Sequence, residues 1–78
     1  MTGDLLLVVR TAVATALERD RSAIAPEARL REDLGADSLT LLEMAAIVEE
    51  QTRLHIPDED LDGLRTVSDV VEHCEAQR

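Results

Sequence analysis

The feature that most restricts the fold of this chain is the absence of aromatic residues: its 78 residues include no Phe, Tyr or Trp. Hydrophobic residues still make up 45% of the sequence. A core therefore has to be assembled from aliphatic side chains and Met, packed at the density of a protein interior. At this length roughly 60% of the surface of the unfolded chain is buried on folding, so we predict one domain, residues 1–78, of modest stability.

Apolar residues recur at helical spacing in three stretches of the sequence, which indicates an all-α fold. These stretches cover residues 4–18, residues 38–53 and the segment after Thr66. A short additional helix is expected at about residues 59–62, where Gly63 would end it. Together the elements predict a four-helix bundle with a long loop between helices 1 and 2 and a short third helix.

The long loop, residues 20–36, contains Pro26 and several short polar residues, which disfavour a helix. Ile24 and Leu30 are expected to pin this loop to the core. In the last helix the apolar positions recur at intervals of three and four residues: Val67, Val70, Val71 and Cys74. We therefore predict that Cys74 is a buried core residue rather than a reactive thiol.

The most informative stretch lies where the long loop meets the second helix. Gly35 can adopt the positive φ that a β-carbon disfavours, and Asp37 has the short acceptor side chain that caps a first helical turn. Ser38 would then lie just inside the helix with its hydroxyl free. The alternative is that Ser38 is itself the N-cap residue, although Leu41 stands where a capping box has Glu or Gln.

The segment Asp33-Leu34-Gly35-Ala36-Asp37-Ser38-Leu39 resembles the 4′-phosphopantetheine attachment motif of acyl carrier proteins, whose signature is Gly-x-Asp-Ser followed by Leu, Ile or Met. The chain also has the length of that family, and the likeness extends beyond the motif without gaps. It includes Glu43, Glu49-Glu50, Ile56-Pro57-Asp58-Glu59 and Thr66-Val67. This extent makes the resemblance more specific than the short motif alone.

The resemblance implies that Ser38 is the attachment residue and Asp37 its neighbour in the motif. A separate phosphopantetheinyl transferase would join the serine Oγ to the phosphopantetheine of coenzyme A, which leaves an arm that ends in a thiol. The protein would then be a non-catalytic carrier of acyl groups held as thioesters. Its expected partners are that transferase and acyl-loading, ketosynthase or condensing enzymes, and we expect the carrier itself to be a monomer.

The charges are unevenly distributed along the chain. The formal net charge is −9, with eight basic residues against 17 acidic ones. Residues 32–62 hold ten acidic residues and a single arginine, whereas residues 1–31 carry a net charge of +1. The acidic segment would repel nucleic acid and anionic membranes and attract a basic protein surface, so we expect no nucleic acid or membrane partner. The alternative is a solvated acidic face that only maintains solubility.

The second helix is expected to present two different faces. One carries the core stripe: Leu41, Met44, Ala45, Val48 and Thr52. The opposite face carries a second apolar strip edged by acids: Leu39, Leu42, Glu43, Ala46, Glu49 and Glu50. Folding of a small bundle requires only the first stripe, so we interpret the second as a docking surface, as the resemblance to acyl carrier proteins also implies. The alternative is that Leu39 and Leu42 pack beneath the long loop.

Two alternative functions remain open from the sequence. One is a peptidyl carrier, although the acidic second helix favours the acyl type. The other is a calcium-binding interaction module, because Asp58–Asp69 nearly matches the calcium loop of an EF-hand. Against calcium, Asp69 replaces the bidentate Glu and Pro57 stands where a helix should lead into the loop, so we predict no dedicated metal site.

Two positions differ from the carriers of fatty acid synthesis. Thr52 occupies the place where those carriers usually have Phe, and His73 the place where they often have Tyr. The run from Asp37 to Glu43 is also similar to carriers of polyketide pathways. We therefore favour polyketide, lipopeptide or similar specialised biosynthesis over fatty acid biosynthesis.

The remaining signals indicate a protein of the cytoplasm that is not an enzyme. His55 and His73 have no motif that links them to Ser38, so no nucleophile is paired with a base. The apolar run of residues 5–9 is too short for a membrane span and is preceded by Asp4 rather than by a basic region. A single cysteine permits no internal disulfide and is typical of a reducing compartment.

Overall fold

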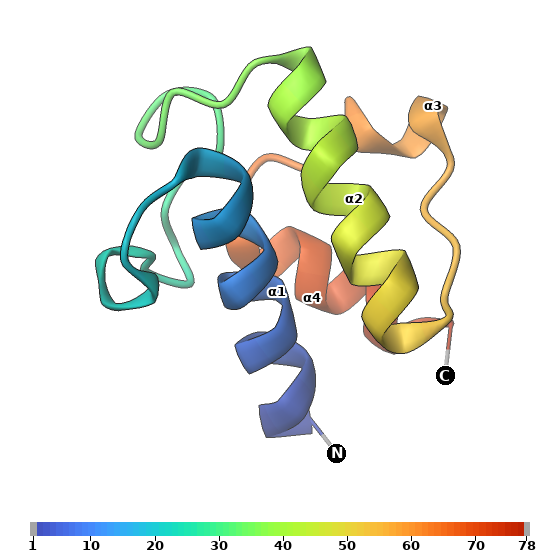
Figure 1. Cartoon of the computed structure of the whole chain (residues 1–78). Helices are drawn as coiled ribbons and strands as arrows, with labels where there is room; N and C mark the ends of the chain where they lie inside the picture. Colours follow the sequence, from blue (N-terminus) through green and yellow to red (C-terminus); the bar gives the residue numbers. More distant parts are fainter. Residues whose placement is uncertain (1, 78) are drawn as a thin grey trace.

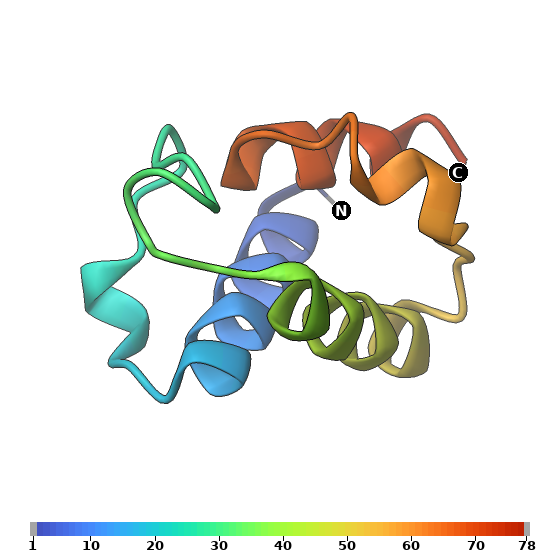
Figure 2. The same ribbon diagram turned by 90° about the horizontal axis from the view of Figure 1, so that it is seen from above.

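The computed structural model describes residues 2–77, with side chains from residue 5 onward. The elements follow in the order α1 (Thr2–Leu17), η1 (Arg21–Ala23), α2 (Ser38–Thr52), α3 (Asp58–Leu61) and α4 (Val67–Glu75). Helices α1 and α2 lie side by side, α4 crosses behind them, and the short α3 lies beside α2 (Figure 1 and Figure 2). The predicted all-α bundle with four helices is confirmed, and its predicted helix boundaries lie within two residues of those in the structure.

The core lies between α1, α2 and α4 and is built from aliphatic side chains, Met and Cys. Its largest fully buried members come from all three helices and from the long loop: Val9, Val13, Ile24, Leu30, Met44, Val48, Val67, Val70 and Cys74. Among the described side chains none that is polar or charged is buried. The predicted burial of Cys74 is confirmed, and hydrophobic burial is the main source of stability for this small bundle.

The long loop is pinned to the core as predicted, because Ile24 and Leu30 are only 0% and 1% exposed. The loop also contains the 3-10 turn η1, which apolar periodicity did not predict. Asp20 caps this turn by accepting a hydrogen bond from the Ser22 N–H at 3.0 Å. Arg10 of α1 donates from Nε to the Ile24 carbonyl at 2.9 Å. The loop is therefore held by polar contacts as well as by its two buried side chains.

The end of the long loop is tied to the start of α4. The Leu30 N–H donates to the Arg65 carbonyl at 2.7 Å. Ser68 donates to the Pro26 carbonyl twice, from its N–H at 2.8 Å and from its Oγ at 2.9 Å. These hydrogen bonds satisfy backbone groups that would otherwise be unpaired in the loop. They also fix the last part of the loop, and with it the approach to α2, relative to α4.

The helix ends differ in backbone conformation. Gly63 follows the end of α3, as expected, but without the left-handed conformation common at a helix end, since among the described glycines only Gly35 has a positive φ. The turn after α3 is instead closed by the Gly63 N–H, which donates to the Asp60 carbonyl at 3.0 Å. Left-handed residues follow two other helices: Glu18 after α1, with a φ of 55°, and Arg53 after α2, with a φ of 62° and an N–H that donates to the Glu49 carbonyl. Within the described residues, no helix is both long enough and apolar enough to cross a membrane.

Candidate functional site

A tight turn positions the first residue of α2. Gly35 has a φ of 72°, which confirms the predicted left-handed conformation. A Cβ at this position would meet no atom within 4 Å, so the backbone conformation, and not a lack of space, requires glycine here. The turn is closed by the Gly35 N–H, which donates to the Arg31 carbonyl at 3.1 Å, and by the Ala36 N–H, which donates to the Leu30 carbonyl at 2.9 Å.

Asp37 caps α2, as predicted. Its carboxylate accepts a hydrogen bond from the Thr40 N–H at 2.8 Å, and this bond, which favours the charged form, lowers the pKa of Asp37. Ser38 is the first residue of the helix and is exposed. The alternative that Ser38 is the N-cap residue is therefore wrong. Because Asp37 already satisfies an N–H group of the first turn, the Ser38 hydroxyl is not needed for capping.

The three serines of the chain differ in what their hydroxyls contact. Ser22 Oγ donates to Asp20 Oδ1 at 3.0 Å, and Ser68 Oγ donates to the Pro26 carbonyl at 2.9 Å. Ser38 Oγ makes no hydrogen bond with any other described residue. It is therefore the one serine hydroxyl that an external reagent can approach without breaking an existing hydrogen bond.

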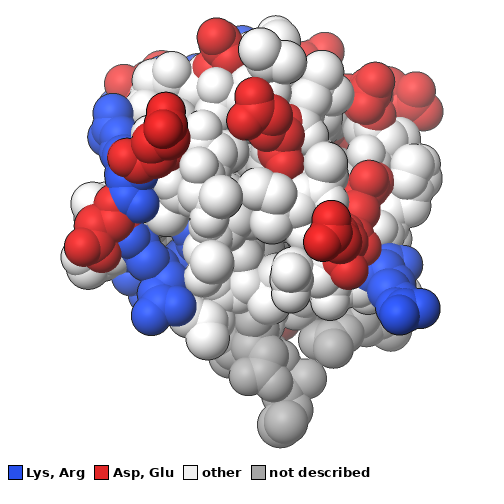
Figure 3. Space-filling model, in the orientation of Figure 1, with Lys and Arg blue, Asp and Glu red and all other residues white. Residues whose placement is uncertain are grey.

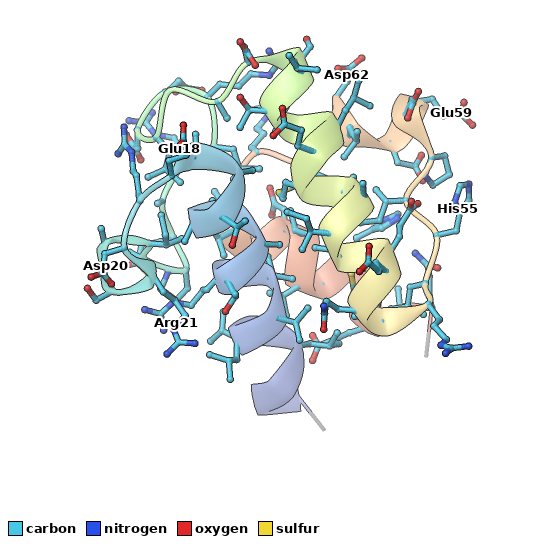
Figure 4. The ribbon with its side chains drawn as sticks, in the orientation of Figure 1. Glu18, Asp20, Arg21, His55, Glu59 and Asp62 are labelled. Atoms are coloured by element: carbon cyan, nitrogen blue, oxygen red, sulfur yellow. The ribbon has the colours of Figure 1, made fainter. Side chains whose placement is uncertain are left out.

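Ser38 lies at the edge of a cleft of about 180 Å³ between the first turns of α2, the helix α3 and the long loop. The cleft is lined by Arg31, Ser38, Leu41, Leu42, Asp58, Leu61 and Asp62. Leu41 and Leu61 are buried, whereas Leu42 is 43% exposed. Asp62 lies beside the first turn of α2 (Figure 4). The cleft thus combines apolar surface with charged side chains next to the serine.

The outer face of α2 is open to solvent. Leu39 is 65% exposed and Leu42 is 43% exposed, so the alternative that these residues pack beneath the long loop is wrong. Glu43, Ala46 and Glu50 on the same face are also exposed. Figure 3 shows acidic side chains spread over the surface that α1 and α2 form, with basic side chains toward its edges. This arrangement provides an apolar patch surrounded by negative charge.

Glu49 differs from the other acids of this helix because its carboxylate is turned toward the segment that follows α2. Glu49 Oε2 accepts a hydrogen bond from the Ile56 N–H at 2.6 Å and lies 2.9 Å from His55 Nδ1. The Gln77 side chain holds the same segment, since it bonds both the N–H and the carbonyl of His55, a residue that Figure 4 labels. Sequence reasoning missed these contacts of Glu49 and Gln77 with residues 55 and 56. The place of Glu49 on the docking surface stays a prediction.

The acidic segment between Asp58 and Asp69 does not form a calcium loop. Its first four residues are helix α3, and Asp69 Oδ2 accepts hydrogen bonds from the N–H groups of Arg65 and Thr66 at 3.0 and 3.1 Å. These bonds lower the pKa of Asp69, and its reciprocal bonds with Thr66 form a capping box. Across the described residues, no group of three or more His, Cys, Asp or Glu side chains is placed to hold a metal ion. The geometry therefore contradicts the EF-hand alternative.

Comparison with known proteins finds relatives that cover most of the chain. Residues 8–74 match the family model described as "Phosphopantetheine attachment site". The chain is 44% identical over 78 residues to an acyl carrier protein of Exiguobacterium sp., covering 99% of each. It is 40% identical over 70 residues to an acyl carrier protein of Helicobacter hepaticus, covering 90% of this chain and 92% of the relative.

Among solved structures, the chain is similar to a free-standing peptidyl carrier protein from an uncharacterized secondary metabolic pathway of Acinetobacter baumannii. The TM-score is 0.83 at 21% sequence identity, with 97% of this chain and 94% of the other covered. At this identity the likeness concerns the fold alone.

Proposed function

The chain belongs to the acyl carrier protein family, and from this premise we propose that Ser38 is the residue that bears its 4′-phosphopantetheine, on a single carrier domain of residues 1–78. Proteins of this family are non-catalytic carriers, and the bound prosthetic group supplies the thiol to which acyl groups are attached as thioesters. The observation that carries the proposal is the Ser38 hydroxyl itself. It is exposed on the first turn of α2 and has no hydrogen bond within the described part of the chain.

The surroundings of Ser38 fit such a group. A phosphodiester on Ser38 Oγ would lie at the N-terminal end of α2, where the unpaired N–H groups and the helix dipole favour negative charge. The adjacent cleft offers apolar surface from Leu42 and Leu61 to the aliphatic part of the arm. Neither feature requires the bundle to open.

The chain's own residues present the hydroxyl but do not activate it. The left-handed turn at Gly35 and the cap at Asp37 fix the first turn of α2, and therefore the position of Ser38. No described residue accepts a hydrogen bond from Ser38 Oγ, so none of them is placed as a base for its proton. The transferase must supply the group that accepts this proton when the oxygen attacks phosphorus.

The outer face of α2 supports the proposal of a docking surface for the transferase and for acyl-handling enzymes. Leu39, Leu42 and Ala46 would make the apolar contacts, and Glu43 and Glu50 would attract basic patches on the partners. This surface begins one residue after Ser38, so a partner seated on it would reach the attachment residue. Assignment to a specialised pathway, rather than to fatty acid synthesis, stays a prediction, as does the monomeric state.

The attachment residue can be tested by intact mass. Apo protein is incubated with coenzyme A and a broad-specificity phosphopantetheinyl transferase, and we expect the wild type to gain the mass of one phosphopantetheine. Ser38→Ala should gain none. Ser22→Ala and Ser68→Ala are the matched controls, since both remove a hydroxyl that is already hydrogen-bonded. Loading of Ser38→Ala, or failure of the wild type to load, would contradict the proposal.

The docking surface can be tested by charge reversal. Glu43→Arg with Glu50→Arg should reduce the association rate with the transferase roughly tenfold at low salt, because steering by opposite charge is lost. The control is Glu27→Arg with Glu72→Arg, which changes the net charge equally at exposed acids outside α2. Equal effects of the two pairs would mean that net charge, and not this surface, attracts the partner.

A further inference from the structure

The charged side chains that line the cleft beside Ser38 are unequal in sign. Asp58 and Asp62 are acidic, and Arg31 is the one basic residue among the described residues that line it. The pair that crosses the cleft is loose: Arg31 Nη2 lies 3.7 Å from Asp62 Oδ1, and the two side chains are 49% and 85% exposed. Exposed pairs of this kind contribute little to stability. The pair therefore does not explain why an arginine is placed here.

Arg29, two residues earlier in the same loop, is held by close ion pairs and provides a comparison for Arg31. Its guanidinium lies 2.7 Å from Glu32 and 3.1 Å from Asp33. The hydrogen bond to Asp33 raises the pKa of Arg29, and the same contact lowers the pKa of Asp33. Among the described side chains, Arg31 has a single contact of this kind, the long one to Asp62, so its guanidinium can change partner at small cost.

A phosphodiester on Ser38 would change the balance of charge in the cleft. It adds a permanent negative charge to a site that already contains Asp58 and Asp62, with Asp37 directly preceding the serine. Negative charges in one small cleft repel one another. An arginine that donates two hydrogen bonds to phosphate oxygens is the side chain best suited to offset this repulsion. Arg31 is the cation that the fold brings to this cleft.

We propose that Arg31 breaks its contact with Asp62 and binds the phosphodiester of the prosthetic arm. Arg31 is then a positioning residue for the root of the arm. The proposal rests on the proposed attachment at Ser38. In the unloaded protein Arg31 contacts Asp62 of the segment after α3, and in the loaded protein it ties the loop to the phosphate. The arm then leaves Ser38 along the cleft from a fixed root.

The test is a thermodynamic cycle that combines loading with a substitution. The melting temperature is measured for apo and loaded forms of the wild type and of Arg31→Gln, at low salt, with intact mass confirming that each sample is loaded. On loading, the melting temperature of the wild type should rise more, or fall less, than that of Arg31→Gln, by roughly 1–6 °C. Equal changes in the two proteins would overturn the proposal. A failure of loading itself would instead be visible as an unchanged mass and would count against Ser38 as the attachment residue.

Two variants separate the phosphate contact from the loop contact. Asp62→Asn removes the competing carboxylate and keeps the arginine. The change in its melting temperature on loading should therefore exceed that of Arg31→Gln by as much as the wild type's does, or by more. Arg19→Gln removes an exposed arginine outside the cleft and should behave as the wild type. If Asp62→Asn abolished the difference as Arg31→Gln does, Arg31 would act through Asp62 and the proposal would be wrong.

A measurement on the wild-type protein alone gives an independent readout. In ¹⁵N-labelled protein the Arg31 Nε–Hε resonance should shift when the protein is loaded, and the shift should shrink when salt is raised to about 1 M, where the screening length is about 3 Å. The Arg29 resonance is the internal control, because Arg29 keeps its partners Glu32 and Asp33. An Arg31 resonance that does not move on loading would overturn the proposal.

Discussion

Helices α2 and α4 begin with similar polar residues, but the two starts are used differently. At the start of α4, Thr66 and Asp69 cap each other's backbone and Ser68 donates to the Pro26 carbonyl. At the start of α2, Asp37 provides the cap, and the Ser38 hydroxyl makes no hydrogen bond with another described residue. The start of α4 is closed and holds the long loop, whereas the start of α2 presents a hydroxyl to solvent.

The comparison shows when a polar side chain at a helix start becomes available for chemistry. A serine hydroxyl can satisfy a backbone group, as Ser68 does, and it then contributes to stability. It is available to an external enzyme only when another residue has already met the need of the backbone, as Asp37 does for α2. The fold thus separates the residue that stabilises the helix start from the residue that reacts.

The largest expected effect tests whether one residue supports both starts. Leu30 is 1% exposed, its N–H donates to Arg65 just before α4, and its carbonyl accepts from Ala36 just before α2. Leu30→Ala should lower the free energy of unfolding by about 2–5 kcal/mol, because it leaves a cavity at this junction. Urea denaturation measures the loss. Leu39→Ala, at an exposed position, should cost less than about 0.5 kcal/mol, and a similar loss in both variants would contradict this role of Leu30.

The second prediction concerns the turn that delivers Ser38. Gly35→Ala forces a β-carbon into a left-handed conformation and should lower the free energy of unfolding by about 1–2 kcal/mol. Gly63→Ala is the control, since its φ is not in the left-handed region and its new Cβ would lie 3.5 Å from the Asp60 carbonyl oxygen, an ordinary contact. In thermal unfolding, the melting temperature of Gly35→Ala should lie well below that of Gly63→Ala. The reverse order would mean that the turn is not held as the structure shows.

The two serines provide the most direct contrast. Ser68→Ala removes the side-chain hydrogen bond to Pro26 and should lower the free energy of unfolding by about 1 kcal/mol. Ser38→Ala removes no hydrogen bond to a described residue, so its stability should stay within about 0.5 kcal/mol of the wild type. Denaturation of the two unloaded variants side by side measures the difference. Equal losses would erase the distinction between a closed and an open helix start.

The smallest expected effect is a dependence of stability on pH. The N–H groups of Arg65 and Thr66 lower the pKa of Asp69 in the folded protein below its ordinary value of 3.8. The charged carboxylate therefore stabilises the fold at pH values above 3.8, and this contribution is lost as the pH falls through the lower, folded-state pKa. The melting temperature of the wild type should exceed that of Asp69→Asn at pH 6, and the difference should shrink below pH 3.8. A difference that grows as the pH falls would contradict the sign of the shift.

Much of the fold and the centre of the site could be predicted because they depend on residues close together in the chain. Helical periodicity predicted α1, α2 and α4, and the apolar side chains that it placed on the inner face of α2 are buried, apart from Thr52 at the end of the helix, which is half-buried. Other features gave no periodic signal. Three features depend on how the chain is placed after the helices pack: the turn η1, the left-handed end of α2 at Arg53 and the hydrogen bond from the Ile56 N–H to Glu49.

The sequence by itself determined the helices, the left-handed turn at Gly35 and the unused hydroxyl of Ser38, because each depends on residues within about four positions of one another. Only the tertiary structure decided that Ser68 meets Pro26, 42 residues away, and that Arg31 faces Asp62 across the cleft beside the serine. These contacts join segments that are distant in the chain. Which of them meet depends on how the long loop packs against α3 and α4, and no repeat of apolar and polar residues along the sequence encodes that placement.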